Sequence, residues 1–180
     1  MEPIVLFGIQ FTLSLVAYVL IAFWYVAPRL SRLPRELAVV PLLWVHVFRV
    51  VGGTILAPGA VGPGVPMEFR TMIGFGDLIT AFIALLALTA LRIRLPSAIA
   101  VVWLLLIVGM LDTVNAIVQS MRFNVFTYPL GVNWVIVTSY VPALLVSSLL
   151  LTRYQMSDNR CQTAVARRET RDARHPTSDI

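Results

Sequence analysis

Long apolar stretches alternate with short polar connections along most of the chain. Five stretches reach the length of about 20 mostly apolar residues that a helix needs to cross a bilayer. They cover residues 4–27, 37–57, 71–91, 97–119 and 130–152. The connections are too short to hold a separate soluble domain. The pattern therefore predicts an all-α, polytopic membrane protein in which residues 1–152 form a bundle of five transmembrane helices.

Composition supports this prediction and separates the last residues from the bundle. The 180 residues are 58% hydrophobic and 13% charged, with a mean hydropathy of +0.84, which lies outside the range of soluble domains. Residues 157–180 have few apolar side chains and no helical stripe, so we expect residues 153–180 to form a disordered polar cytoplasmic tail. The expected location is the plasma membrane, the inner membrane in a bacterium, where lipids surround the bundle.

The arginines predict how the bundle is oriented. Eleven of them lie in the first connection, the third connection or the tail, whereas only Arg70 and Arg122 lie on the opposite side. Because positive charge concentrates on the cytoplasmic side, we expect the N-terminus outside and the C-terminus in the cytoplasm. The basic residues are dispersed over short loops and alternate with acidic residues in the tail, so no nucleic-acid partner is expected.

Three charged residues lie inside the apolar stretches. Arg49 sits near the middle of residues 37–57, where an arginine costs roughly 2.5–3.5 kcal/mol on insertion scales, so it needs a partner. Asp77 and Asp112 lie in the next two stretches. With a rise of 1.5 Å per residue, all three fall about 9–12 Å below the outer ends of their helices. We therefore expect Arg49 to reach both carboxylates in the outer half of the membrane.

Further polar residues are predicted around these three. His46 precedes Arg49 by one turn, and Gly53 is expected to continue the same face. Asn115 follows Asp112 by one turn toward the outer mouth, and Gln10 falls at a similar depth. The segment at residues 58–66, PGAVGPGVP, is expected to cover the mouth. The predicted ligand- or ion-binding residues are Arg49, Asp77, Asp112, His46, Asn115 and Gln10.

The predicted cluster contains two carboxylates but only one guanidinium. The excess negative charge must be met by protonation of one aspartate, by His46 as an imidazolium, or by a bound cation. This favours binding or passage of a small cation, proton or polar ligand from the outer side. The alternative is a structural clasp, meaning ion pairs that only fix helix packing, in a non-catalytic sensor or subunit of a membrane complex with like or unlike partners.

The residue types present in the sequence exclude several kinds of functional site. The chain has no lysine, which excludes a Schiff base and a P-loop lysine, and its lone Cys161 excludes an intramolecular disulfide. No zinc-type spacing of cysteine and histidine occurs, so no metal site is predicted. His46 is the only histidine in the predicted membrane region, which excludes a haem held by two histidines of one chain. A haem held by His46 and Met110 stays compatible with the residue types present. No cofactor is assigned.

A short motif provides an enzymatic alternative. Residues 74–77, GFGD, resemble the GxGD motif of intramembrane aspartyl proteases, and residues 142–144, PAL, are similar to the PAL element of the presenilin branch. The resemblance implies that Asp77 and Asp112 form a catalytic pair that shares a proton and activates water. In that family the second aspartate precedes GxGD, whereas Asp112 follows it. A non-catalytic binding protein therefore remains the favoured prediction.

Overall fold

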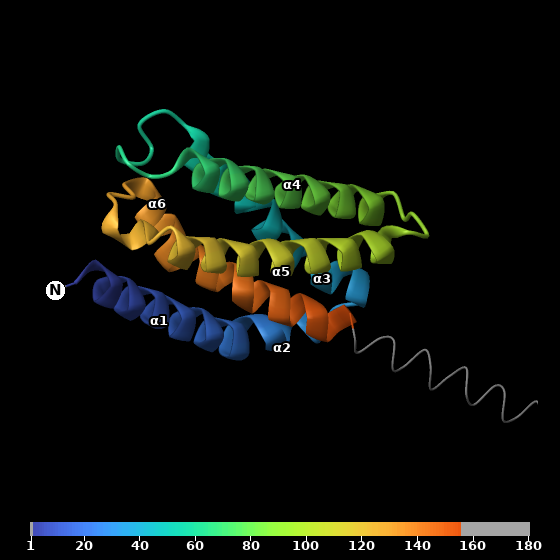
Figure 1. Ribbon diagram of the computed structural model, residues 1–180. Helices are drawn as coiled ribbons and strands as arrows, with labels where there is room; N and C mark the ends of the chain where they lie inside the picture. The colour runs from blue at the N-terminus through green and yellow to red at the C-terminus, as the bar shows by residue number, and fades with distance from the viewer. Residues whose placement is uncertain (1, 156–180) are drawn as a thin grey trace, which may run out of the picture.

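The computed structural model describes residues 2–155, which are helical apart from their connections (Figure 1). The elements are α1 (Pro3–Ile21), a π-helix (Ala22–Val26), α2 (Ala27–Leu30), α3 (Arg35–Val47), a 3-10 helix (Phe48–Leu56), α4 (Met67–Arg92), α5 (Ala98–Arg122), a short 3-10 helix (Val125–Thr127), α6 (Val132–Val135) and a π-helix (Ile136–Tyr140). Residues 141–155 continue the last helix. The predicted tail beyond residue 155, including Cys161, lies outside the described residues.

These elements join into five continuous helical spans. They are Pro3–Leu30, Arg35–Leu56, Met67–Arg92, Ala98–Arg122 and Val132–Gln155, called here the first to fifth spans. Each is long and apolar enough to cross a membrane, which confirms the prediction of an all-α chain with five such helices. The third span begins at Met67, directly after Pro66, and the fourth ends at Arg122, so both extend beyond the predicted apolar stretches.

The spans run up and down, so their connections gather at two ends (Figure 1). The N-terminus and the connections 57–66 and 123–131 lie at one end, called the loop end. The connections 31–34 and 93–97 and the end of the fifth span lie at the other, called the tail end. The first span is peripheral, because none of the residues Pro3–Ile21 is buried.

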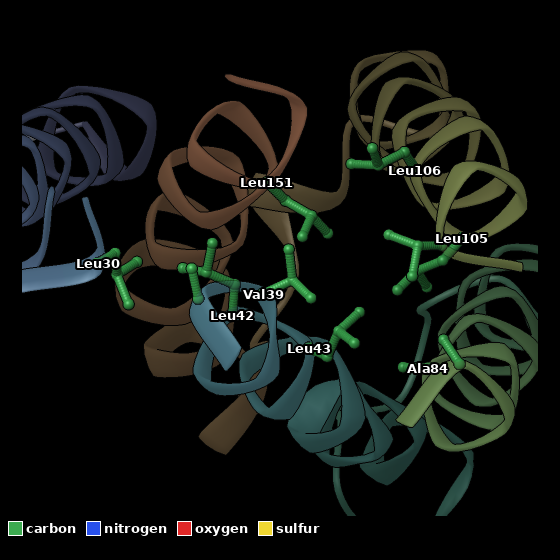
Figure 2. Packing of buried hydrophobic residues seen from close by; sticks show 11 residues of the cluster. Leu30, Val39, Leu42, Leu43, Ala84, Leu105, Leu106 and Leu151 are labelled. Carbon is green, nitrogen blue, oxygen red and sulfur yellow. The ribbon is translucent and has the colours of Figure 1, made fainter. Parts of the chain in front are cut away.

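Apolar side chains fill the half of the bundle next to the tail end. Figure 2 shows leucines and Val39 from different helices pointing into one interior. Alanines on α4 let the second and fourth spans approach the third closely. We call this group the tail-end cluster; its buried members are Leu30, Ala38, Val39, Leu42, Leu43, Ala84, Ala87, Val102, Leu105, Leu106 and Leu151.

A second apolar group closes the loop end. This loop-end cluster consists of Ile55, Val61, Val65, Phe69, Val125 and Leu130. Connection 57–66 is tied to it by polar contacts: the Gly62 N–H donates to the Pro129 carbonyl at 2.7 Å, and Asn133 Nδ2 donates to the Ala60 carbonyl at 3.1 Å. The connection therefore packs across this end of the bundle.

The second span changes its winding close to Arg49. It is an α-helix to Val47 and a 3-10 helix over the nine residues Phe48–Leu56, although 3-10 runs longer than three or four residues are uncommon. A 3-10 helix has three residues per turn, so positions three apart share a face. The buried residues of this segment are Arg49, Gly52 and Ile55. The prediction that Gly53 shares the face of Arg49 is therefore wrong, because it assumed α-helical spacing.

Candidate functional site

Arg49 is enclosed by the third and fourth spans, with 4% of its surface exposed. Its Nε donates to Asp77 Oδ1 and its Nη2 donates to Asp112 Oδ2, both at 2.5 Å. Nη2 also donates to Thr113 Oγ1 at 3.1 Å, and Nη1 donates to the Gly109 carbonyl at 3.2 Å. The expected pairing of Arg49 with both aspartates is confirmed, and we call these three residues the charge cluster.

The helix bounds place the charge cluster deeper than expected. Arg49 lies seven residues of 3-10 helix from Leu56, and Asp77 lies ten α-helical residues from Met67. Asp112 lies ten residues before Arg122. These separations correspond to about 14–15 Å at rises of 2.0 and 1.5 Å per residue, so the three levels still coincide. The cluster lies on the loop-end side of the bundle, yet closer to its middle than the predicted 9–12 Å.

Each charged side chain rests on a glycine of a neighbouring span. A Cβ added to Gly52 would lie 1.8 Å from Asp77 Oδ2, and one added to Gly76 would lie 1.9 Å from Asp112 Oδ1. A Cβ on Gly109 would lie 3.6 Å from Arg49 Nη1. The second, third and fourth spans thus each contribute one charge and one glycine. The glycines make room for the carboxylates where an ordinary side chain would collide with them.

Each carboxylate contacts Arg49 through only one of its two oxygens. Asp77 accepts through Oδ1 and Asp112 through Oδ2, and their side chains are 15% and 12% exposed. Within residues 2–155, no other side chain donates a hydrogen bond to either carboxylate. One guanidinium faces two carboxylates, so the cluster carries one excess negative charge when both aspartates are ionised.

His46 lies one turn before Arg49 and is 1% exposed. Its Nε2 is 3.3 Å from Ser147 Oγ on the fifth span. Its Nδ1 is buried and has no hydrogen-bond partner in the described part of the chain. The structure therefore places His46 beside the charge cluster along the chain, with a contact to the fifth span that the sequence did not indicate.

The fourth span carries polar side chains from the cluster toward the loop end. Asn115 follows Asp112 by one turn and accepts a hydrogen bond from Gln119 Nε2 at 3.4 Å. Asn115 is partly buried, and the Oε1 atom of Gln119 is buried without a partner among the described residues. These two amides form a polar line above Asp112.

Gln10 is not part of this group. It is exposed on the first span, where its Oε1 accepts a hydrogen bond from Trp134 Nε1 at 2.6 Å. The neighbouring Phe7 packs against Phe126 and Trp134, so this face of the first span is directed to the loop-end half of the fifth span. Depth alone suggested that Gln10 adjoins the cluster, but the peripheral position of its helix prevents this.

Sequence reasoning missed three kinds of contact in the site. Thr113 receives a hydrogen bond from Arg49 while donating to the Gly109 carbonyl at 2.8 Å. Its position next to Asp112 was the only available signal. The role of the glycines was missed because their partners lie on other helices. Nothing in the sequence indicated that the Tyr140 hydroxyl donates its hydrogen to the Val45 carbonyl near the start of the 3-10 helix.

The geometry also bears on the chemical alternatives. Asp77 and Asp112 are joined through Arg49, and no hydrogen bond links the two carboxylates directly in the described chain. This differs from a pair that shares one proton. Met110 is 38% exposed whereas His46 is buried, so they do not face a common haem site. Residues 2–155 contain no group of three or more His, Cys, Asp or Glu that could hold a metal ion.

Comparison with known proteins gives one match. A family model described as Domain of unknown function (DUF8737) matches residues 6–154, which include the charge cluster and all five spans apart from the outermost residues of the first and fifth. Searches of curated proteins and of solved structures found no match to the chain.

Proposed function

This chain belongs to the DUF8737 family, and because the function of that family is unknown, we propose one from the geometry. The charge cluster binds a small cation, a proton or a small polar ligand within the membrane. The observation that carries this proposal is the pairing of one buried guanidinium with two carboxylates, each of which keeps one oxygen free of Arg49. In a medium of low dielectric, the excess negative charge favours uptake of a cation or a proton.

The residues on the two sides of the charge cluster differ in polarity, and this difference favours access of the ligand from the loop end. Asn115 and Gln119 extend from Asp112 toward that end and provide amide groups that a passing water molecule or ion can contact. Toward the tail end, the buried members of the tail-end cluster are all leucine, valine or alanine. This apolar cluster disfavours passage of charge on that side, so the ligand enters and leaves by the loop end.

We further propose that the loop end faces the outside of the cell. Six arginines of the described chain lie at the tail end, whereas Arg70 and Arg122 lie at the loop end. The six are Arg29, Arg32, Arg35, Arg92, Arg94 and Arg153. The positive-inside rule then places the N-terminus outside and the tail in the cytoplasm.

A topology reporter tests this orientation. A reporter that is active only in the cytoplasm should be active when fused after Arg153 and inactive when inserted at Gly59, which lies in connection 57–66 with open space around it. As a native check, the thiol of Cys161 should resist an impermeant reagent in intact cells. Labelling of Cys161 from outside, together with reporter activity at Gly59, would reverse the proposed orientation.

Access to the charge cluster is tested by cysteine labelling. In a C161S background, the N115C variant should react with a small water-soluble thiol reagent added from the loop-end side. The expected reason is that residue 115 lies on the polar line through which the ligand reaches Asp112. Adding D112N removes a negative charge one turn away, so the thiol should ionise more readily and the labelling rate should rise several-fold.

Two matched cysteines complete this experiment. A57C, exposed at the loop end, should react fully, and V102C, fully buried in the tail-end cluster, should not react. If N115C stays as unreactive as V102C at every pH tested, the cluster is closed to water. The charges are then a structural clasp, and the proposed binding function is wrong.

A further inference from the structure

Two buried side chains one helical turn apart each keep one hydrogen-bonding group unused. The first is Nδ1 of His46. Ser147 has one hydroxyl hydrogen, which is directed to the Leu144 carbonyl at 3.0 Å, so Ser147 Oγ accepts from Nε2–H of His46. This fixes the neutral tautomer with the proton on Nε2 and leaves a lone pair on Nδ1. His46 therefore presents a buried acceptor without a donor.

The second group belongs to Arg49. A guanidinium has five N–H bonds, and four of them are directed to Asp77, Asp112, Thr113 and the Gly109 carbonyl. The fifth, on Nη1, has no acceptor among residues 2–155. Arg49 is three residues after His46, and both side chains are buried on the same face of the second span. The unused donor of Arg49 and the unused acceptor of His46 thus belong to residues one turn apart.

We propose that His46 and Arg49 together bind a single internal water molecule. The water donates to His46 Nδ1 and accepts from Arg49 Nη1–H, which satisfies both groups at once. Buried polar groups in proteins are nearly always paired, and internal waters usually supply the partner where the protein does not. A metal cation is unsuited to this position because the guanidinium charge repels it. The water site does not depend on the proposed function of the charge cluster.

The bound water has a consequence for the bundle. It continues the hydrogen-bonded chain from Asp112 through Arg49 to His46 and then to Ser147. The fourth, second and fifth spans become connected by polar contacts at one depth.

Nitrogen NMR of histidine tests the water site directly. In the H175Q variant, His46 is the only histidine in the sequence. With histidine labelled by ¹⁵N, we expect one protonated nitrogen, assigned to Nε2, and one non-protonated nitrogen shifted from the position of an unbonded imidazole nitrogen by its hydrogen bond. A cross-peak between that nitrogen and water protons should be present.

Two results would overturn the proposal. One is a non-protonated Nδ1 at the position of an unbonded nitrogen without a water cross-peak, which would mean that the space is dry. The other is a proton on Nδ1, which would make it a donor and remove the acceptor on which the site depends. Wild-type protein measured in parallel gives the same readout with one additional histidine, so the test stands even if H175Q fails to fold. Labelling of N115C reports on the charge cluster separately.

Discussion

Replacing Arg49 with leucine should destabilise the protein more than replacing Arg49 and one aspartate together. The single change leaves Asp77 and Asp112 facing each other without a counter-charge at a depth of about 15 Å below the helix ends. Breaking a buried ion pair from one side typically costs about 3–5 kcal/mol. The double variants R49L/D77N and R49L/D112N remove one of the stranded charges and should recover part of that loss.

Thermal unfolding in detergent or in nanodiscs measures this difference. R122Q is the matched control, because Arg122 is an exposed arginine at the loop end outside the charge cluster; it should unfold at nearly the wild-type temperature. The expected signature is strong non-additivity between the Arg49 and aspartate changes. Effects that simply add would show that the three side chains do not interact.

Replacing Gly76 with alanine should displace Asp112 from Arg49. The new Cβ would lie 1.9 Å from Asp112 Oδ1, which forces the carboxylate or the helices to move. Overpacking of this kind costs about 1–3 kcal/mol. Gly52→Ala should act in the same way on Asp77, since its Cβ would lie 1.8 Å from Oδ2. Loss of the ion pair adds to the cost in both variants.

Gly8 on the first span provides the control for the glycine variants. A Cβ at Gly8 meets nothing within 4 Å, so G8A should be neutral or slightly stabilising in a helix. The double variant G76A/D112A should lose less than the sum of its two single changes, because D112A removes the group that collides. If G76A is as stable as G8A, Asp112 is not seated on Gly76.

The charge cluster was predictable because the membrane makes an unpaired charge costly. Arg49 needed a partner, few ionisable residues were available, and counting residues from the helix ends placed Asp77 and Asp112 at its level. Such counting gives a depth but not a direction around the helix axis. Gln10 had a suitable depth, yet its helix packs at the periphery and holds Trp134 instead.

Other details depend on winding and on neighbours that periodicity does not reveal. An α-helical period places Gly53 beside Arg49, whereas the 3-10 segment places Gly52 there. The depth of the cluster was underestimated because α4 and α5 continue past the apolar residues to Met67 and Arg122. The contact of His46 with Ser147 joins residues 101 positions apart, and only the packing of the spans brings them together.

The nine-residue 3-10 segment also links the position of Arg49 to the winding of the second span. If Phe48–Leu56 rewound as an α-helix, it would shorten by about 4.5 Å and turn one end relative to the other by about half a rotation. Arg49 lies near one end of this 3-10 helix, and Leu56 lies at the other end, where connection 57–66 begins. Such a change of winding would therefore rotate Arg49 relative to connection 57–66.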